Sequence, residues 1–294
     1  MVRFKVLTVS MSMTLIENNY GASHVRLIKV RRLQDRHDLK ELSVGIQFEG
    51  EFESSYTTGD NRSILPADTI KNTVYALAKL YTIEQIEDFA QQLINHFLTD
   101  NAQVKRVRVE IAEYLWTRIP FGGKQHPWSF TPAGPERRTT IVTGTRETVF
   151  IESGIENLQV VKTTGSGFEG YLHDPFTTLK ETSDRILATA VKASWLYSDN
   201  EIPFSVYWHG IRQAILDTFV EHESRSMQYT LHAMAEAVLE RYEDIAEIHL
   251  WVPNKDCRLV DLGLFGLENK NEVFAPAEEP FELIEARLRR ETLD

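Results

Sequence analysis

The sequence predicts an α+β protein built from two similar modules, each an antiparallel sheet with a helix pair on one face. Two patterns lead to this fold class. Segments that alternate apolar and polar residues at period two are followed by segments with helical periodicity. The same order of elements then recurs roughly 140 residues further along the chain. We expect residues 1–19 to be an N-terminal extension, residues 20–145 the first module and residues 146–294 the second.

The first module is predicted to begin with a long hairpin whose first strand, from Val25, is rich in β-branched residues. A charged turn at Asp35 to Asp38 separates it from the second strand. The predicted segments are, in order, strands at 25–33 and 42–56, helices at 68–80 and 82–98, a strand at 104–119 and a hairpin at 139–153. The Gly and Pro cluster from Pro120 to Pro135 predicts a long loop between strands.

The second module is predicted to repeat this order. Its predicted segments are strands at 158–164 and 184–197, helices at 204–223 and 226–242, and a strand at 245–255. A helix pair on one face of each sheet leaves the other face uncovered, and this favours assembly with further copies of the chain.

Composition narrows the classes of partner. The 294 residues are 42% hydrophobic and carry a net charge of -11, which disfavours nonspecific attraction to nucleic acid or to an anionic membrane. No run approaches the length of about 20 apolar residues that a membrane helix needs. The single cysteine, Cys257, excludes an intramolecular disulfide framework and fits a reducing compartment, so we expect a cytoplasmic protein.

Several strings imitate known site motifs but lack the required context. Residues Gly165 to Gly170 match G-x-G-x-x-G, yet a β-rich stretch follows where a dinucleotide loop needs a helix. His222 and Glu223 begin a zinc-protease motif, but Ser226 stands where the second histidine is needed. No Cys/His cluster has metal-ligand spacing, and no G-x-S-x-G elbow anchors a triad. We therefore expect no metal and no cofactor.

A set of longer blocks is more specific, and in this order along the chain the blocks resemble consecutive segments of the urate oxidase family. This resemblance implies a tandem tunnelling fold that assembles into a barrel-like homotetramer with sites between subunits. It also implies oxidation of urate by dioxygen, without any cofactor, to 5-hydroxyisourate and hydrogen peroxide. The blocks are Tyr20-Gly21, SYTTGDN (55–61), ADTIKNTVYALAK (67–79), SGIENLQVVKTTGSGFEGY (153–171), DPFTTLKETSDRILAT (174–189), SMQYTLHAM (226–234), Pro253-Asn254-Lys255 and NEVFAP (271–276).

The resemblance assigns purine-binding roles to particular residues. Phe168 matches the ring on which the purine stacks, Arg185 the guanidinium that forks onto one edge of urate, and Gln228 the amide that pairs with the opposite edge. Asp68 and Met227 match positions that offer backbone N–H groups to the purine. Asn254 matches the amide beside the place where dioxygen or water sits above the ring, and the site is implied to join Ala67 and Asp68 of one subunit to the remaining residues of a neighbour.

Three positions depart from the family pattern. Ala22, Ala67 and Asp256 stand where the resemblance implies a catalytic lysine, threonine and histidine that relay the substrate proton. Ser23 and His24 lie one and two residues from the missing lysine, but a shift of one residue on a strand turns a side chain to the other face and a shift of two residues moves it along the strand.

Three explanations remain open for these departures. The chain is an inactivated or engineered uricase, or it acts on another purine-like substrate, or Asp256 and water rebuild a relay.

Overall fold

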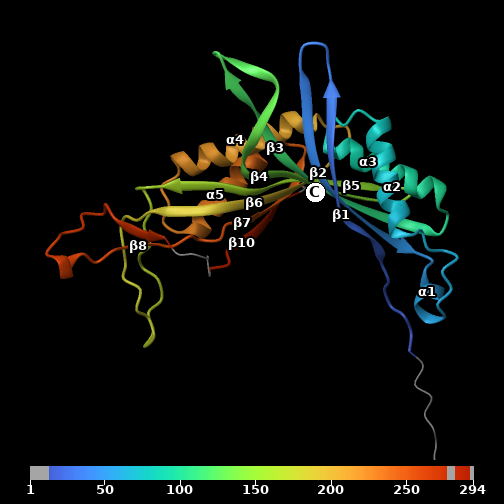
Figure 1. Ribbon diagram of the computed structural model, residues 1–294. Coiled ribbons are helices and arrows are strands. Elements are labelled where there is room, and N and C mark those ends of the chain that lie inside the picture. Colours follow the sequence, from blue (N-terminus) through green and yellow to red (C-terminus); the bar gives the residue numbers. More distant parts are fainter. Residues whose placement is uncertain (1–12, 277–281, 292–294) are drawn as a thin grey trace, which may run out of the picture.

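The computed structural model describes residues 13–276 and 282–291, and its central feature is one eight-stranded antiparallel sheet (Figure 1). The strand order is β1-β2-β3-β4-β5-β6-β7-β10, and a separate two-stranded ribbon pairs β8 with β9. The strands are β1 (Tyr20–Arg32), β2 (His37–Gly50), β3 (Val104–Phe121), β4 (Lys124–Gly144), β5 (Val149–Lys162), β6 (Leu187–Tyr197), β7 (Ile245–Trp251), β8 (Cys257–Leu259), β9 (Phe274–Pro276) and β10 (Glu285–Arg289).

The four long helices lie where helical periodicity predicts them. In α2, for example, Ile70, Val74, Leu77 and Ala78 recur at helical spacing and are the residues that become buried. The helices are α1 (Glu53–Thr57), α2 (Ala67–Leu80), α3 (Ile86–Asp100), α4 (Phe204–Glu221), α5 (Met227–Arg241) and the short 3₁₀ helix η1 (Gly263–Phe265). No helix in the described part of the chain is long and apolar enough to cross a membrane.

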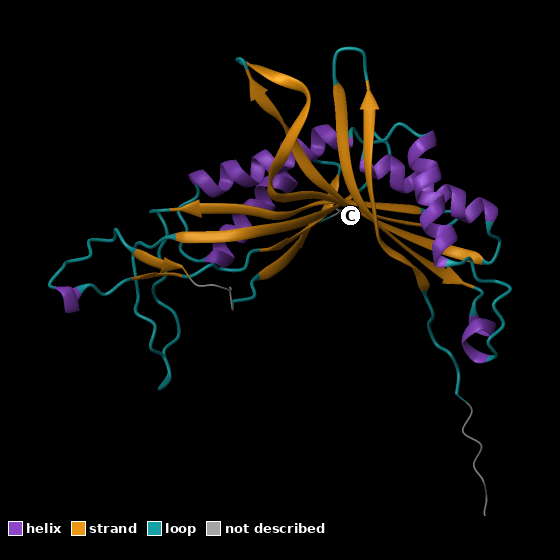
Figure 2. Cartoon of the chain, in the orientation of Figure 1, coloured by secondary structure: helices purple, strands orange, loops and turns teal. Residues whose placement is uncertain are grey.

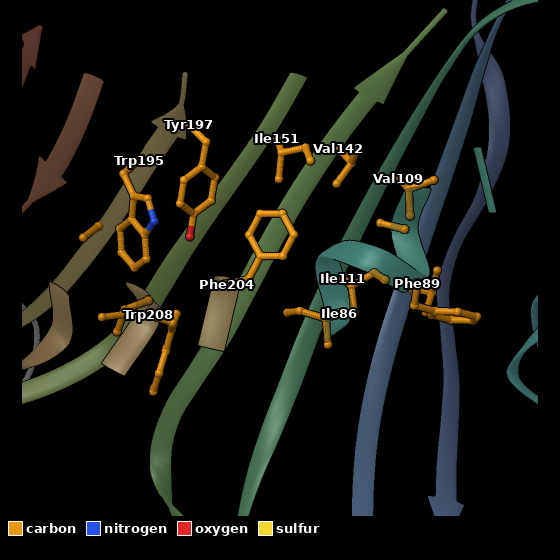
Figure 3. Packing of buried hydrophobic residues seen from close by; sticks show 14 of the residues in the cluster. Ile86, Phe89, Val109, Ile111, Val142, Ile151, Trp195, Tyr197, Phe204 and Trp208 are labelled. Carbon is orange, nitrogen blue, oxygen red and sulfur yellow. The ribbon is translucent and has the colours of Figure 1, made fainter. Parts of the chain in front are cut away.

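The helices cover one face of the sheet, and the hydrophobic core lies between the two layers (Figure 2). Strand β2 shows how the sequence builds it, because Leu42, Val44, Ile46 and Phe48 alternate with polar residues and are at most 1% exposed. Figure 3 shows side chains from the strands meeting Phe89 of α3 and the α4 residues Phe204 and Trp208. Pairing of β4 with β5 carries this layer from the first half of the chain into the second.

The other face of the sheet carries charged side chains. A depression of about 650 Å³ crosses the central strands there. Within it, the carboxylate of Glu156 forms ion pairs with Lys192 at 3.0 Å and with Arg137 at 3.8 Å. Ser23 and His24 line the same depression from β1. This face therefore presents a polar surface, whereas the opposite face of the same strands is apolar and packed.

The prediction of a long loop from Pro120 to Pro135 is wrong. Strands β3 and β4 continue as a hairpin arm through this region and join at Gly122 and Gly123, whose φ angles of 59° and 77° suit a two-residue turn. Strand β5 pairs only with residues 137–144 of β4, so the rest of the arm has no neighbour on that side. An unpaired strand edge tolerates proline, because proline has no N–H to donate to a neighbouring strand.

A second difference concerns the predicted strand at 42–56. Strand β2 ends at Gly50, and residues 53–57 form helix α1 instead. A Cβ atom at position 50 would lie 2.1 Å from the carbonyl oxygen of Gln103, so the chain needs glycine where it leaves the sheet.

The predicted N-terminal extension lies largely outside the described residues, and its last part, 13–19, forms neither helix nor strand. The division into two modules at residue 145 stays a prediction.

Candidate active site

The loop 163–186 and β8 lie at one end of the molecule (Figure 1). Residues of both line a cavity of about 1050 Å³. Its walls come from this loop, the start of α5, the segment after β7 and the segment that precedes β10. The cavity brings together six of the residues proposed from the sequence: Phe168, Arg185, Met227, Gln228, Asn254 and Asp256.

Phe168 is held by backbone pairing within its loop. Its N–H donates to the carbonyl oxygen of Thr182 at 2.7 Å, and its carbonyl oxygen accepts from the N–H of Thr182 at 3.2 Å. The ring of Tyr171 stacks on the Phe168 ring with centroids 4.8 Å apart and an interplanar angle of 16°. An aromatic surface is thus fixed in orientation at the cavity wall. No helix follows the glycine-rich string that contains Phe168 until α4, and the stretch up to β6 is an irregular loop where the sequence predicted β-structure.

Arg185 lies beside this aromatic surface. Its guanidinium carbon is 5.2 Å from the centroid of the Phe168 ring, and its backbone N–H donates to the carbonyl oxygen of Ser166 at 2.7 Å. Its Nε is buried and has no hydrogen-bond partner among the described residues. Burial lowers the pKa of Arg185, while the charges of Glu282 and Asp256 act in the opposite sense. The guanidinium remains charged and retains donors for a ligand.

Asp184 anchors the loop next to Arg185. Its carboxylate accepts hydrogen bonds from the Thr164 hydroxyl and from the N–H of Gly165, both at 2.9 Å. The Thr164 hydroxyl, followed by backbone donors, holds the pKa of Asp184 below its ordinary value. The two ends of the loop are therefore tied together beneath the cavity.

Met227 and Gln228 begin helix α5. The hydroxyl oxygen of Ser226 caps this helix by accepting the N–H of Tyr229 at 3.1 Å. Met227 is buried at 2% exposure, which fixes the first turn, whereas Gln228 is exposed. The first N–H groups of a helix lack partners within it, so this turn can offer donors to a polar ligand edge.

Asn254 and Asp256 follow β7 and line the cavity, and they differ in burial and in their partners. Asn254 is 6% exposed and forms an isolated β-bridge with Thr189, which places its amide deep in the wall. The carboxylate of Asp256 is paired with Arg258, whose Nε lies 2.8 Å from Oδ2. Asp256 thus already has a cationic partner within the cavity.

The structure does not bring Ala22, Ala67 and Asp68 to this cavity. Ala67 and Asp68 open helix α2, which lies at the opposite end of the molecule from β8 (Figure 1). Ala22 lies in β1, and the N–H of Leu65 donates to the Tyr20 hydroxyl at 2.9 Å, which ties β1 to the start of α2. We call Ala22, Ala67 and Asp68 the N-terminal corner. One chain therefore holds two separated groups of the proposed residues.

Neither Ser23 nor His24 can take the place of a lysine at position 22. The pairing of β1 with β2 shifts register between Ala22 and Val25, and His24 has a left-handed φ of 56°. This bulge turns Ser23 and His24 toward the charged face of the sheet, whereas Ala22 packs against the core. The side chains of Ser23 and His24 serve a different surface.

The cavity also includes residues to which the sequence assigned no role. Some of these residues lie in segments that resemble the urate oxidase family but have no role implied by it. No sequence pattern points to Glu282, Leu283 or Ile284. These additional lining residues include Leu179, Lys180, Arg258, Phe274, Glu282, Leu283 and Ile284. Within residues 13–276 and 282–291, no group of three or more His, Cys, Asp or Glu side chains is arranged to hold a metal ion.

Comparison with known proteins identifies the family. The family model described as Uricase matches residues 18–143 and 151–285. The uricase of Arthrobacter globiformis is 40% identical over 275 residues, covering 94% of this chain and 89% of its own length. The uricase of Danio rerio is 35% identical over 280 residues, covering 93% and 94%.

Solved structures agree with this assignment. The crystal structure of uricase from Arthrobacter globiformis superimposes with a TM-score of 0.91 at 39% identity, covering 97% of each chain. The predicted α+β tunnelling fold is thereby confirmed. The chain belongs to the uricase family.

Proposed function

We propose that the chain is a urate oxidase, which oxidises urate with dioxygen to 5-hydroxyisourate and hydrogen peroxide without a cofactor. The observation that carries this proposal is the convergence of Phe168, Arg185, Gln228 and Asn254 on one cavity in a chain of the uricase family. These residues come from three segments far apart in the sequence, and together they suit a flat ligand with polar edges.

Each residue has a defined part in binding. The purine stacks on Phe168, which the pairing with Thr182 holds in place. Arg185 donates to one edge of the purine through a charge-assisted fork, and the amide of Gln228 pairs with the other edge. The first turn of α5 at Met227 adds a backbone N–H, and Asn254 places an amide beside the dioxygen position.

The complete site is proposed to lie between subunits of a homotetramer. The cavity and the N-terminal corner lie at opposite ends of one chain, so Ala67 and Asp68 reach a purine only from a neighbouring copy (Figure 1). Asp68 contributes its backbone N–H. Its carboxylate is turned to Lys71 and Asn72, and the hydrogen bond from Lys71 lowers the pKa of Asp68. The charged sheet face suits the wall of a water-filled channel through such an assembly.

The chemistry comes mainly from the substrate. A deprotonated purine is electron-rich and reduces dioxygen, so the protein has to orient the purine, remove a proton and stabilise the anion. Ala22 and Ala67 have no proton to give or take, and Asp256 is paired with Arg258. We therefore expect the affinity for purines to be retained and the turnover of urate to be slow. We place this activity in the cytoplasm, because a single cysteine fits a reducing compartment.

Purified protein tests the proposal. We expect urate absorbance to fall together with oxygen uptake and formation of hydrogen peroxide, and treatment with a metal chelator to leave the rate unchanged. Urate binding without any oxygen uptake would instead indicate a purine-binding homologue that does not oxidise urate. Loss of activity with the chelator, restored by added metal, would contradict the cofactor-free mechanism.

A further inference from the structure

The segment that precedes β10 places a carboxylate in the cavity wall. Glu282, Leu283 and Ile284 all line the cavity. The carbonyl oxygen of Ile284 accepts the N–H of Val252 at 2.9 Å, and β10 then pairs with β7 from Glu285 onward. This backbone pairing holds Ile284 beside Val252, so the exposed residue Glu282 lies two residues before a position that is fixed next to the end of β7.

The three carboxylates of the cavity differ in their partners. Asp184 accepts hydrogen bonds from its own loop, and Asp256 is paired with Arg258 at 2.8 Å. Glu282 makes neither an ion pair nor a hydrogen bond with any residue that the structure describes. Its oxygens are thus available to accept a proton or a hydrogen bond from a ligand.

The other ionisable groups of the cavity are unsuited to accepting a proton. Arg185, Arg258 and Lys180 are side chains that donate hydrogen bonds and have no acceptor. The thiol of Cys257 donates toward the carbonyl oxygen of Lys255, with sulfur and oxygen 3.7 Å apart. Among the described groups, Glu282 therefore has the chemistry of a base.

Glu282 also lies near the group that is proposed to hold the purine. Glu282 and Arg185 line the same cavity, and the charge of Glu282, like that of Asp256, opposes the lowering of the Arg185 pKa by burial. A carboxylate without a partner among the described residues and a guanidinium are thus present in one cavity.

We propose that Glu282 is the general base of this site and accepts a proton from the purine ring N–H beside Arg185. In this step the N–H bond breaks, an O–H bond forms on the Glu282 carboxyl group, and the electron pair stays on the ring nitrogen. Arg185 stabilises the negative charge that develops, and the anion is the species that reduces dioxygen. The assignment rests on the proposed function for its substrate class.

The first test is the variant Glu282→Ala, assayed by oxygen uptake with urate. We expect kcat to fall by about 10²- to 10⁴-fold while KM changes little, and formate to restore turnover by entering the vacated space as a small carboxylate. The matched control is Glu268→Ala, which removes the same charge from an exposed residue that pairs with Lys270 and does not line the cavity. This control should behave as the unaltered protein.

The second test needs no oxidation and so separates this assignment from the proposed function. The probes are xanthine and its 1-methyl and 3-methyl derivatives, with binding measured by calorimetry. The unaltered protein should bind xanthine about tenfold or more tightly than the derivative whose methyl group replaces the N–H facing Glu282. Glu282→Ala should lose this discrimination.

Each outcome decides a different point. An unchanged kcat in Glu282→Ala, or rescue of Asp256→Ala by formate when Glu282→Ala is not rescued, overturns the assignment to Glu282. Unchanged discrimination among the xanthines overturns it even in a protein that does not consume oxygen. Discrimination that depends on Glu282, in a protein that consumes no oxygen with urate, supports the assignment and contradicts only the proposed oxidation.

Discussion

The cavity and the N-terminal corner differ in the functional groups that they present. The cavity holds an oriented ring at Phe168, a half-buried guanidinium at Arg185 and an amide at Asn254. The corner presents only methyl groups at Ala22 and Ala67, where the family resemblance implies a lysine and a threonine. The difference teaches that the groups proposed to hold the purine lie together in the cavity, whereas the corner presents no side chain that can transfer a proton at Ala22 or Ala67.

The largest effect is expected when the three altered positions are restored to the residues that the family resemblance implies. The combined change Ala22→Lys, Ala67→Thr and Asp256→His should raise turnover by at least about 10²-fold, because it returns general acid-base groups. Affinity for xanthine should change little, since the cavity keeps its stacking ring and its guanidinium. Oxygen uptake and calorimetry measure the two effects.

A matched variant checks the geometry of this restoration. Ser23→Lys in place of Ala22→Lys puts the lysine one residue away, on the charged face of the sheet, and should give no gain. If the unaltered protein already turns over at a typical enzyme rate and the restoration adds nothing, the relay implied by the family is not used by this chain.

The next largest effect is expected from the cavity itself. Arg185→Ala should weaken purine binding by about 1.5 to 3 kcal/mol, or roughly 10- to 150-fold, the range for a hydrogen bond to a charged group. Arg225→Ala is the control, because Arg225 is exposed just before α5 and does not line the cavity. Equal affinities of the two variants would show that the cavity is not the purine site.

A smaller effect is expected from the anchor of the loop. Asp184→Asn should lower purine affinity by about three- to tenfold at neutral pH, because a neutral amide replaces a charged acceptor. Asp174→Asn is the control: Asp174 holds a turn in the same loop by accepting from Phe176 at 2.8 Å, and it does not line the cavity. A similar loss in both variants would mean that the loop as a whole, not its anchor, sets the affinity.

The same anchor predicts a pH dependence. The pKa of Asp184 is lowered from 3.8 by the Thr164 hydroxyl and backbone donors, so the folded loop favours the ionised carboxylate. The stabilisation of the loop by the ionised carboxylate is fully present above the ordinary pKa of aspartate. It is lost as the pH falls through the lowered pKa of Asp184. We expect Asp184 to contribute no change in affinity between about pH 7 and pH 5, and a loss below about pH 4 that Asp184→Asn does not show.

Much of the fold follows from periodicity in the sequence. Helices such as α2 and strands such as β2 have apolar residues at the spacing of the face that they bury. The hairpin arm around Gly122 was mispredicted because proline and glycine are as compatible with an unpaired strand edge as with a loop. Local sequence does not specify which of these two situations applies.

The candidate site was predictable only in part. Phe168 and Arg185 lie in blocks whose resemblance to a family assigns them roles, and the structure brings them together. Glu282 has no such signal, because it reaches the cavity through the pairing of β10 with β7, which joins segments far apart in the chain. The separation of the N-terminal corner from the cavity likewise depends on the whole sheet.

The central claim is that each purine site is completed by a second copy of the chain, and mixed assemblies test it most directly. Ala67→Trp should block the corner and Arg185→Ala should disable the cavity, so each variant alone binds purine poorly. When the two are co-expressed and purified as hybrids, about a quarter of the sites should combine an intact corner with an intact cavity and regain full affinity in a calorimetric titration. Hybrids with no high-affinity sites, or an unaltered monomer that binds purine with full affinity in sedimentation experiments, would contradict the account.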